Sequence, residues 1–327
     1  MIVSLSPEAQ PDEVRRELAA RGLWVGALER SADGKARQFV IGSHSVDGDP
    51  ASLSAIPGVQ NVSVAASAHP RMDAQGHAVL VAGVLVGGPK PVIMAGPCAV
   101  ESEAQIHAIA ERVARQGATF LRGGAFKPRT SPYSFQGRGP EALPWMRRAA
   151  DACGLHVVTE VVSEADVPIV KDHADLLQVG SRNMQNTSLL RAIGQANRPV
   201  LLKRAMAASV EEWLLAGEYL LVHGAPQVVL CERGIRSFDP ATRNLLDLGT
   251  VALLSHVRKI PVIVDPSHAA GRRDLIPTLA RAAIAAGACG LMIETHDDPG
   301  SSMSDGPQAL GPADFEALVR SLPARCA

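Results

Sequence analysis

The chain has 327 residues, more than one typical domain and fewer than three. Its formal net charge is −1 and aromatic residues make up only 3%, which excludes the basic surface of a nucleic-acid or membrane binder and the aromatic platforms that stack bases. Five scattered cysteines without a C-x-x-C pair indicate a reducing compartment. We see no signal peptide in MIVSLSPEAQ and no apolar run long enough to cross a bilayer, so we expect a cytoplasmic protein.

The first part of the chain has the order strand, helix, strand, strand, helix, strand. Apolar stretches predict strands over residues 1–5, 23–28, 38–41 and 59–64, and helical spacing predicts helices over 11–21 and 50–55. This order is that of a ferredoxin-like domain. We therefore assign residues 1–70 to a small domain, and residues 71–90 to a linker and a hairpin that caps the next domain, with 65–77 as the polar linker.

Residues 91–327 alternate buried-type strands with helical segments. Most of the strands are rich in Val, Ile and Leu, as parallel strands buried on both faces must be. They are predicted over residues 92–97, 119–126, 156–162, 176–181, 200–204, 228–234, 262–268 and 290–296. Eight such units predict an α/β fold of the (β/α)₈ TIM-barrel type. A doubly wound open sheet is the alternative, but no G-x-G-x-x-G follows the first strand.

Cations follow several of the predicted strands, where the active site of a TIM barrel lies. They are Arg122, Lys127, Arg129, Arg182, Lys203 and Arg233. One such residue alone is usually a surface charge, but six at one mouth would repel each other unless anions lay among them. They therefore predict binding of phosphate and carboxylate groups. A Schiff base at Lys203 is a second interpretation.

A second group of strand-end residues has the donor types of a metal site. The group consists of Cys98, His268, Glu294 and, in the loop after the last strand, Asp305. One thiolate, one imidazole and two carboxylates suit Mn²⁺, Fe²⁺, Co²⁺ or Zn²⁺ better than Ca²⁺. A buried structural cysteine and a hydrogen-bonded structural histidine are the alternatives. His296, two residues past Glu294, is a rival imidazole.

Several long motifs in a fixed order resemble one enzyme family. They are MAGPCAVES, LRGGAFKPRTSPYSFQG, QVGSRNMQN, LLKR, LCERGIRSF, VDPSHAAGRRD and MSDG. They resemble the 3-deoxy-D-arabino-heptulosonate 7-phosphate (DAHP) synthases, in the branch with an N-terminal ferredoxin-like domain. The related 3-deoxy-octulosonate (KDO) 8-phosphate synthases have an Ala-Asn-Arg type sequence where this chain has Pro128-Arg129-Thr130.

The resemblance implies a metal-dependent condensation of phosphoenolpyruvate with erythrose 4-phosphate, the first step of the shikimate pathway. It implies metal ligation by Cys98, His268, Glu294 and Asp305. It implies that phosphoenolpyruvate is bound by Arg122, Lys127, Arg182, Lys203 and Arg233. It implies that the phosphate of the sugar is bound by Arg129 and Thr130, with Asp265 near the sugar hydroxyls or the metal. Lys127, Cys98 and His268 are the expected catalytic residues.

The small domain resembles the family only in its pattern, and its expected role is allosteric regulation by tyrosine or phenylalanine. A domain that only supports assembly is the alternative. We expect a homo-oligomer, either a dimer or a tetramer. Two further functions stay open at this point. One is a KDO 8-phosphate synthase that uses arabinose 5-phosphate, and the other is a non-catalytic paralogue that senses metabolites.

Overall fold

A computed structural model describes residues 1–30, 34–42, 44–129 and 131–323. The chain divides into two compact units, Met1–Ala68 and His69–Ala327. No helix in the described part of the chain is long and apolar enough to cross a membrane.

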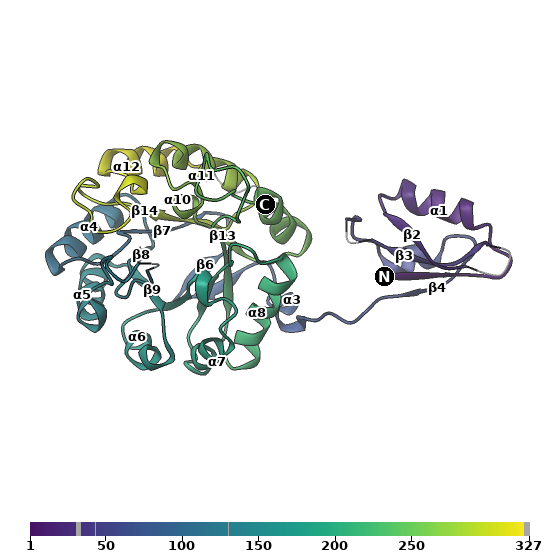
Figure 1. Cartoon of the computed structure of the whole chain (residues 1–327), viewed down its shortest axis with the longest axis horizontal. Coiled ribbons are helices and arrows are strands. Elements are labelled where there is room, and N and C mark those ends of the chain that lie inside the picture. The colour runs from purple at the N-terminus through teal and green to yellow at the C-terminus, as the bar shows by residue number, and fades with distance from the viewer. Residues whose placement is uncertain (31–33, 43, 130, 324–327) are drawn as a thin grey trace. The chain divides into compact units, whose positions relative to one another are not determined.

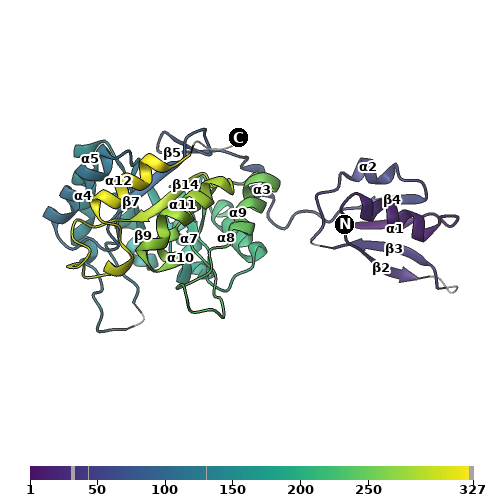
Figure 2. The ribbon, with the colours of Figure 1, turned by 90° about the horizontal axis from the view of Figure 1, so that it is seen from above.

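The first unit is a four-stranded antiparallel sheet with two helices. Its elements follow the predicted order: β1 (Ile2–Leu5), α1 (Pro11–Ala20), β2 (Val25–Arg30), β3 (Ala36–Ile41), α2 (Pro50–Ser54) and β4 (Val59–Ser63). The strands lie in the order β2-β3-β1-β4, and Figure 2 labels both helices and strands β2, β3 and β4. Val14 and Leu18 of α1 and Leu53 of α2 pack on Val3 and Phe39 of the sheet. Both helices therefore share one core, and the ferredoxin-like prediction is confirmed.

The predicted linker contains a packed helix, α3 (Pro70–Ala74), which belongs to the second unit. Met72 is fully buried, and a Cβ on Gly217 would lie 2.7 Å from its sulfur. The backbone N–H groups of Arg71 and Met72 both donate to Glu218 Oε2 at 2.9 Å. The linker prediction is wrong for this segment, because one buried methionine and one capping carboxylate hold a helix whose composition is otherwise small and polar.

A β-hairpin closes the amino-terminal end of the barrel. It consists of β5 (Val79–Val81) and β6 (Val84–Val86), with Ala82 and Gly83 at φ 49° and 84°. Two left-handed residues between the strands are typical of a tight hairpin turn. The hairpin valines share a core with inward-facing barrel residues such as Met94, Ile263 and Met292. The barrel is therefore filled by side chains rather than open as a channel.

Eight parallel strands form the closed barrel, with helices in a ring around them (Figure 1). The strands are β7 (Val92–Gly96), β8 (Phe120–Arg122), β9 (His156–Val161), β10 (Leu176–Val179), β11 (Val200–Lys203), β12 (Val228–Glu232), β13 (Val262–Val264) and β14 (Gly290–Glu294). The barrel closes where β14 pairs with β7, from Gly290↔Val92 to Glu294↔Gly96. All eight predicted strands are present, and the TIM-barrel prediction is confirmed.

The barrel helices present apolar faces to the strands. They are α4 (Glu103–Arg115), α5 (Ala142–Cys153), α6 (Val167–Lys171), α7 (Thr187–Gln195), α8 (Val210–Val222), α9 (Leu248–Ala252), α10 (Pro266–Ala270), α11 (Ile276–Ala285) and α12 (Pro312–Ser321). Their buried side chains, such as Ile106, Leu189, Trp213 and Phe315, form one core with the outward faces of the strands. Burial of these stripes is the main force that holds a barrel together.

The seventh strand ends earlier than the sequence predicts. β13 stops at Val264, and Asp265 begins the short helix α10, in which Pro266 is the first residue. The Asp265 carboxylate accepts the backbone N–H of His268 at 2.9 Å, as a helix N-cap does. His268 therefore lies on a helix that covers the end of the strand.

Candidate active site

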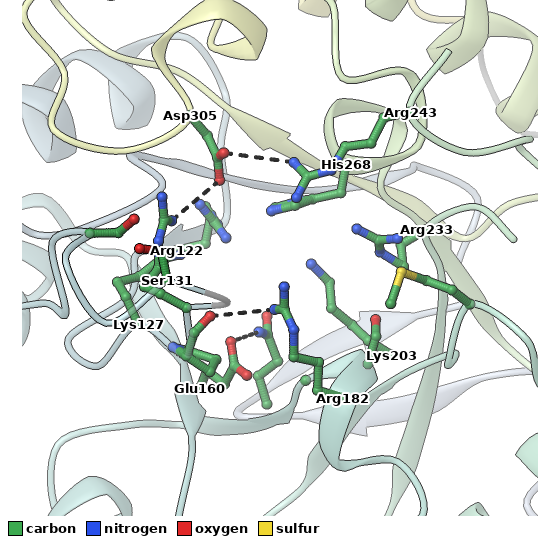
Figure 3. Close-up of a pocket in the computed structure, with 17 residues that line it drawn as sticks. Arg122, Lys127, Ser131, Glu160, Arg182, Lys203, Arg233, Arg243, His268 and Asp305 are labelled. Carbon is green, nitrogen blue, oxygen red and sulfur yellow. Dashed lines mark hydrogen bonds and ion pairs between the residues drawn. The ribbon is translucent and has the colours of Figure 1, made fainter. Parts of the chain in front are cut away.

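A polar cavity of about 290 Å³ lies at the carboxyl ends of the barrel strands (Figure 3). Its walls come from residues in or after seven of the eight strands, and no single segment forms it. The lining residues include Arg122, Lys127, Pro128, Arg129, Ser131, Glu160, Gln178, Arg182, Lys203, Arg233, Arg243, His268 and Asp305. The structure thus brings all six sequence-predicted cations to one cavity. The closure of a parallel barrel explains this, because every strand delivers its carboxyl end to the same face.

Two of the cations have buried nitrogen atoms without a protein partner in the described ranges, Arg122 Nε and Arg233 Nη1. Both side chains are about 95% buried, and Arg233 points toward the middle of the cavity in Figure 3. Burial lowers the pKa of Arg233, although the nearby Asp265 carboxylate acts to raise it. An unpaired buried donor is costly, so these arginines are poised to bind an anionic ligand that supplies the missing acceptors.

Arg243 is a seventh cation in the cavity, and the sequence analysis missed it. It lies in the long loop between β12 and α9, where Ile235 and Leu245 pair as an antiparallel bridge. Backbone hydrogen bonds from Arg243 to Ala270 O and from Asn244 to Ala269 O pin this loop to α10. The Arg243 side chain then lies 3.6 Å from Asp305. A search restricted to strand ends could not find it.

Three of the predicted metal ligands lie close together. Cys98 Sγ and carboxylate oxygens of Glu294 and Asp305 all lie within 4.8 Å of one another. Cys98 and Glu294 are buried, and Asp305 is partly exposed. His268 Nε2 lies 3.3 Å from Glu294 Oε1, so the fourth predicted ligand borders the same group. His268 and Asp305 also line the cavity. One thiol, two carboxylates and an imidazole grouped in this way fit a borderline divalent cation.

The protonation of Cys98 depends on what binds there. Burial raises the pKa of the Cys98 thiol to about 12, and the nearby Glu294 carboxylate adds to the rise. The neutral thiol donates to Asp305 Oδ2 at 3.1 Å. A divalent cation would replace that proton, because a coordinating thiol loses it outright. The same atoms can therefore share the thiol proton of Cys98 or bind a divalent cation in its place.

Asp265 orients His268 from behind the cavity wall. Its Oδ2 accepts His268 Nδ1 at 2.7 Å and Lys203 Nζ at 2.5 Å. Burial alone would raise the pKa of Asp265, but His268 and Lys203 outweigh it and hold the pKa well below its usual range. Burial lowers the pKa of His268 despite Asp265 and Glu294. A neutral imidazole that donates from Nδ1 keeps Nε2 free to bind a metal.

At the ends of β11 and β12, the side chains of adjacent residues point to opposite sides of the barrel wall. Arg204, next to Lys203, donates to Glu232 at 3.0 Å and to Asp247 at 2.9 Å. Its guanidinium lies 5.7 Å from the Trp213 ring centre, on the helix side of the barrel. Because side chains alternate along a strand, Lys203 and Arg233 line the cavity while Arg204 and Glu232 stabilise the wall.

The other sequence-predicted positions lie as follows. His296 contacts Gln105 Nε2 at 3.0 Å and accepts Asp298 N–H at 3.1 Å, so it faces α4 and its own loop. Thr130 lies outside the described residues, while its neighbours Arg129 and Ser131 line the cavity. Glu160 and Gln178 were missed; they come from the inward face of β9 and β10, and Gln178 donates to Glu160 at 3.3 Å. Polar residues inside otherwise apolar strands were the signal that could have found them.

The fold and the cavity together define a class of protein: a TIM-barrel enzyme for small, strongly anionic substrates, with a candidate metal group beside the anion site. Residues 63–323 match the model of the DAHP synthetase I family. The chain belongs to this family, and the resemblance found in its motifs is confirmed.

Individual relatives and solved structures are similar to this chain over most of its length. A phospho-2-dehydro-3-deoxyheptonate aldolase of Thermotoga maritima is 47% identical over 239 residues, 73% of this chain and 71% of that one. A 2-dehydro-3-deoxyphosphooctonate aldolase of Acidithiobacillus ferrooxidans is 34% identical over 70% of this chain and 87% of its own length. The crystal structure of DAHP synthase from Thermotoga maritima aligns over 98% of this chain and 95% of that chain, with a TM-score of 0.76 and 37% identity. A truncated form of that synthase aligns over 74% of this chain and 89% of its own, with a TM-score of 0.69 and 42% identity.

Proposed function

We propose that this protein is a 3-deoxy-7-phosphoheptulonate synthase, which condenses phosphoenolpyruvate with D-erythrose 4-phosphate and water to give DAHP and phosphate. The observation that carries the proposal is a cavity lined by seven cations beside the Cys98–Glu294–Asp305 group, of which Asp305 lines the cavity. Both substrates are phosphorylated, and phosphoenolpyruvate also has a carboxylate. The product would enter the shikimate pathway to the aromatic amino acids.

Phosphoenolpyruvate would occupy the inner part of the cavity. Its phosphate and carboxylate need several cations, and the candidates are Arg122, Lys127, Arg182, Lys203 and Arg233. Arg122 is held by Glu294 at 3.0 Å and by Pro97 O at 2.7 Å, so its free Nε points in a fixed direction. Arginines fixed before binding lose little entropy when the substrate enters. They also stabilise the negative charge that the phosphate gains when water has added at C2 and the C2–O bond breaks.

The predicted metal ligands are Cys98, His268, Glu294 and Asp305, and we propose that they hold Mn²⁺, Fe²⁺, Co²⁺ or Zn²⁺. Such an ion, when bound, supplies a Lewis acid that polarises the aldehyde oxygen of the sugar. Asp265 keeps the His268 ring oriented through Nδ1, and Gln308 donates to the Glu294 carboxylate. The chain's own contribution is thus a set of ligands fixed in advance by a second layer of hydrogen bonds.

The sugar phosphate would bind at the outer part of the cavity. Arg129, whose Nη1 donates to Ser304 Oγ at 2.7 Å, and Thr130 are the candidates for this role. An anchored phosphate would hold the aldehyde carbon near C3 of phosphoenolpyruvate, so that bond formation occurs between two oriented groups. Lys203 already pairs with Asp265, and the reaction needs no Schiff base, so we propose that Lys203 acts as an ammonium that binds the anion.

The proposal extends to regulation and assembly. We infer that the first unit binds tyrosine or phenylalanine and that the protein is a homo-oligomer. The support for regulation is the separate core of the unit Met1–Ala68.

The decisive experiment measures phosphate release from phosphoenolpyruvate with two alternative sugars, erythrose 4-phosphate and arabinose 5-phosphate, in the presence of Mn²⁺. We expect release with the first sugar only. Lys127→Met should abolish it, while Lys90→Met, which removes an exposed lysine outside the cavity, should leave it unchanged. Preference for arabinose 5-phosphate would make the protein a KDO 8-phosphate synthase, the activity named for the more distant relatives. No release with either sugar would favour a non-catalytic paralogue.

A further inference from the structure

The four proposed metal ligands are held by very different means. Glu294 ends strand β14, is fully buried, and contacts Arg122, Gln308 and His268. His268 is fixed on α10 by Asp265, and Cys98 follows β7 closely. Asp305 lies instead in the loop between β14 and the short helix η6 (Gly306–Gln308), where its carboxylate contacts Cys98 Sγ at 3.1 Å and Arg243 Nη1 at 3.6 Å. Because this loop is not part of a strand or a long helix, the contacts of the residues before Asp305 also decide whether its carboxylate lies beside Cys98.

The backbone conformation of Asp305 also depends on contacts from the residues around it. Asp305 has φ 54° and ψ 27°, a left-handed conformation that costs free energy for a residue with a side chain. A Cβ on the next residue, Gly306, would lie 2.3 Å from Pro299 O, so the loop folds tightly on itself. Surrounding contacts must hold such a conformation. The loop has few apolar anchors, and the side chain of Met303 is half exposed.

Glu101, in the loop after β7, contacts the residues that precede Asp305. Its Oε1 accepts Met303 N–H at 2.8 Å and Ser302 Oγ at 3.3 Å. The Ser302 hydroxyl also lies 2.8 Å from Ser304 O, one residue before Asp305. The Glu101 side chain is only 14% exposed, so these bonds are shielded from water. The Glu101 carboxylate therefore binds the loop after β14 at the residues two and three positions before Asp305.

The main chain of Glu101 is fixed as well. Its N–H donates to Gln105 Oε1 at 3.0 Å, at the start of α4. Its carbonyl accepts Arg138 Nε at 2.8 Å, from the segment between β8 and α5. Residues that follow β7, β8 and β14 thus meet at one residue, three positions after Cys98. Because the main chain of Glu101 is fixed through both its N–H and its carbonyl group, its carboxylate can position the residues before Asp305.

We propose that Glu101 is a positioning residue that fixes the loop of Asp305 against Cys98 and so completes the metal site before the metal arrives. This inference rests on the proposed function, since it assumes that Asp305 and Cys98 bind a metal. Glu101 does not touch the cavity and acts through Asp305. Residues that orient metal ligands in this way typically change metal affinity about 10- to 100-fold when they are replaced.

The test measures Mn²⁺ affinity by calorimetry on the metal-free full-length protein. We expect Glu101→Ala to weaken binding on the order of tenfold or more. Glu101→Gln, whose amide oxygen still accepts Met303 N–H, should restore most of the affinity. The matched control is Glu103→Ala, two residues further on, which removes an exposed carboxylate paired with Arg148 and should bind Mn²⁺ as the unchanged protein does. If Glu101→Ala does not fold, Glu101→Leu keeps most of the volume without the acceptor and is predicted to give the same loss.

A double-mutant cycle separates positioning from general damage. If Glu101 acts through Asp305, Glu101→Ala should weaken Mn²⁺ binding little further in an Asp305→Ala background. Cd²⁺ should still give its thiolate absorption band in Glu101→Ala, because Cys98 stays in place. Equal Mn²⁺ affinity of Glu101→Ala and the unchanged protein, or additive losses in the cycle, would overturn the inference. Failure of the unchanged protein to bind Mn²⁺ would instead overturn the metal dependence in the proposed function.

Discussion

Asp265 is the residue whose replacement should destabilise the barrel most clearly. It is fully buried and accepts three donors: His268 N at 2.9 Å, His268 Nδ1 at 2.7 Å and Lys203 Nζ at 2.5 Å. Asp265→Asn keeps the shape but removes the charge that balances Lys203, which is itself only 5% exposed. Removing one partner of a buried ion pair costs about 3–5 kcal/mol. For a unit of this size, that loss lowers the melting temperature by roughly 6–20 °C.

Thermal unfolding followed by circular dichroism, on metal-free protein, measures this effect. The matched control is Asp274→Asn, which removes the same charge from an exposed pair with Arg272 and should cost about 0–1 kcal/mol. Adding Lys203→Met to Asp265→Asn should recover part of the loss, because the ammonium without a partner is then gone. The reasoning fails if Asp265→Asn melts with the control, or if the double variant is less stable than Asp265→Asn alone.

Three further predictions concern the metal, the sugar phosphate and the first unit. Chelation should abolish phosphate release and Mn²⁺ should restore it, whereas Cys98→Ala should stay folded and inactive; full activity in that variant would remove Cys98 from the site. Arg129→Ala should raise the KM for erythrose 4-phosphate far more than that for phosphoenolpyruvate, by a loss of about 1.5–3 kcal/mol, and an equal effect on both would misplace Arg129. A protein starting at His69, which keeps α3, should retain activity and lose inhibition by tyrosine or phenylalanine. Full inhibition of the shortened protein would place the effector site on the barrel.

The barrel and its cations could be predicted because both depend on local patterns. Runs of Val, Ile and Leu mark strands buried on both faces, and eight of them leave few alternatives to closure. Once the strands are placed, the residues after them must gather at one mouth. Arg182 and Lys203 could therefore be brought together from the sequence alone, although they come from different strands.

Features that depend on tertiary contacts could not be predicted in this way. Arg243 reaches the cavity only because its loop is pinned to α10, which no local pattern reveals. Helix α3 forms because Glu218, far along the chain, caps it. The early end of β13 had a local signal, Asp265 before Pro266, but the apolar strand pattern outweighed it in the sequence analysis.

The positions of Lys203 and Arg204 show how one strand end serves two purposes. Lys203 faces the cavity, whereas Arg204 binds Glu232 and Asp247 behind the wall. Glu232 in turn accepts the N–H of Gly234 at 2.6 Å, on the far side of Arg233. The ion pair of Arg204 and Glu232 thus helps to fix the backbone on both sides of Arg233, whose side chain faces the cavity. Lys203 and Arg233 can be held side by side at one cavity because the strand ends that carry them are joined behind the wall by the buried Arg204–Glu232 ion pair, which does not compete for a ligand.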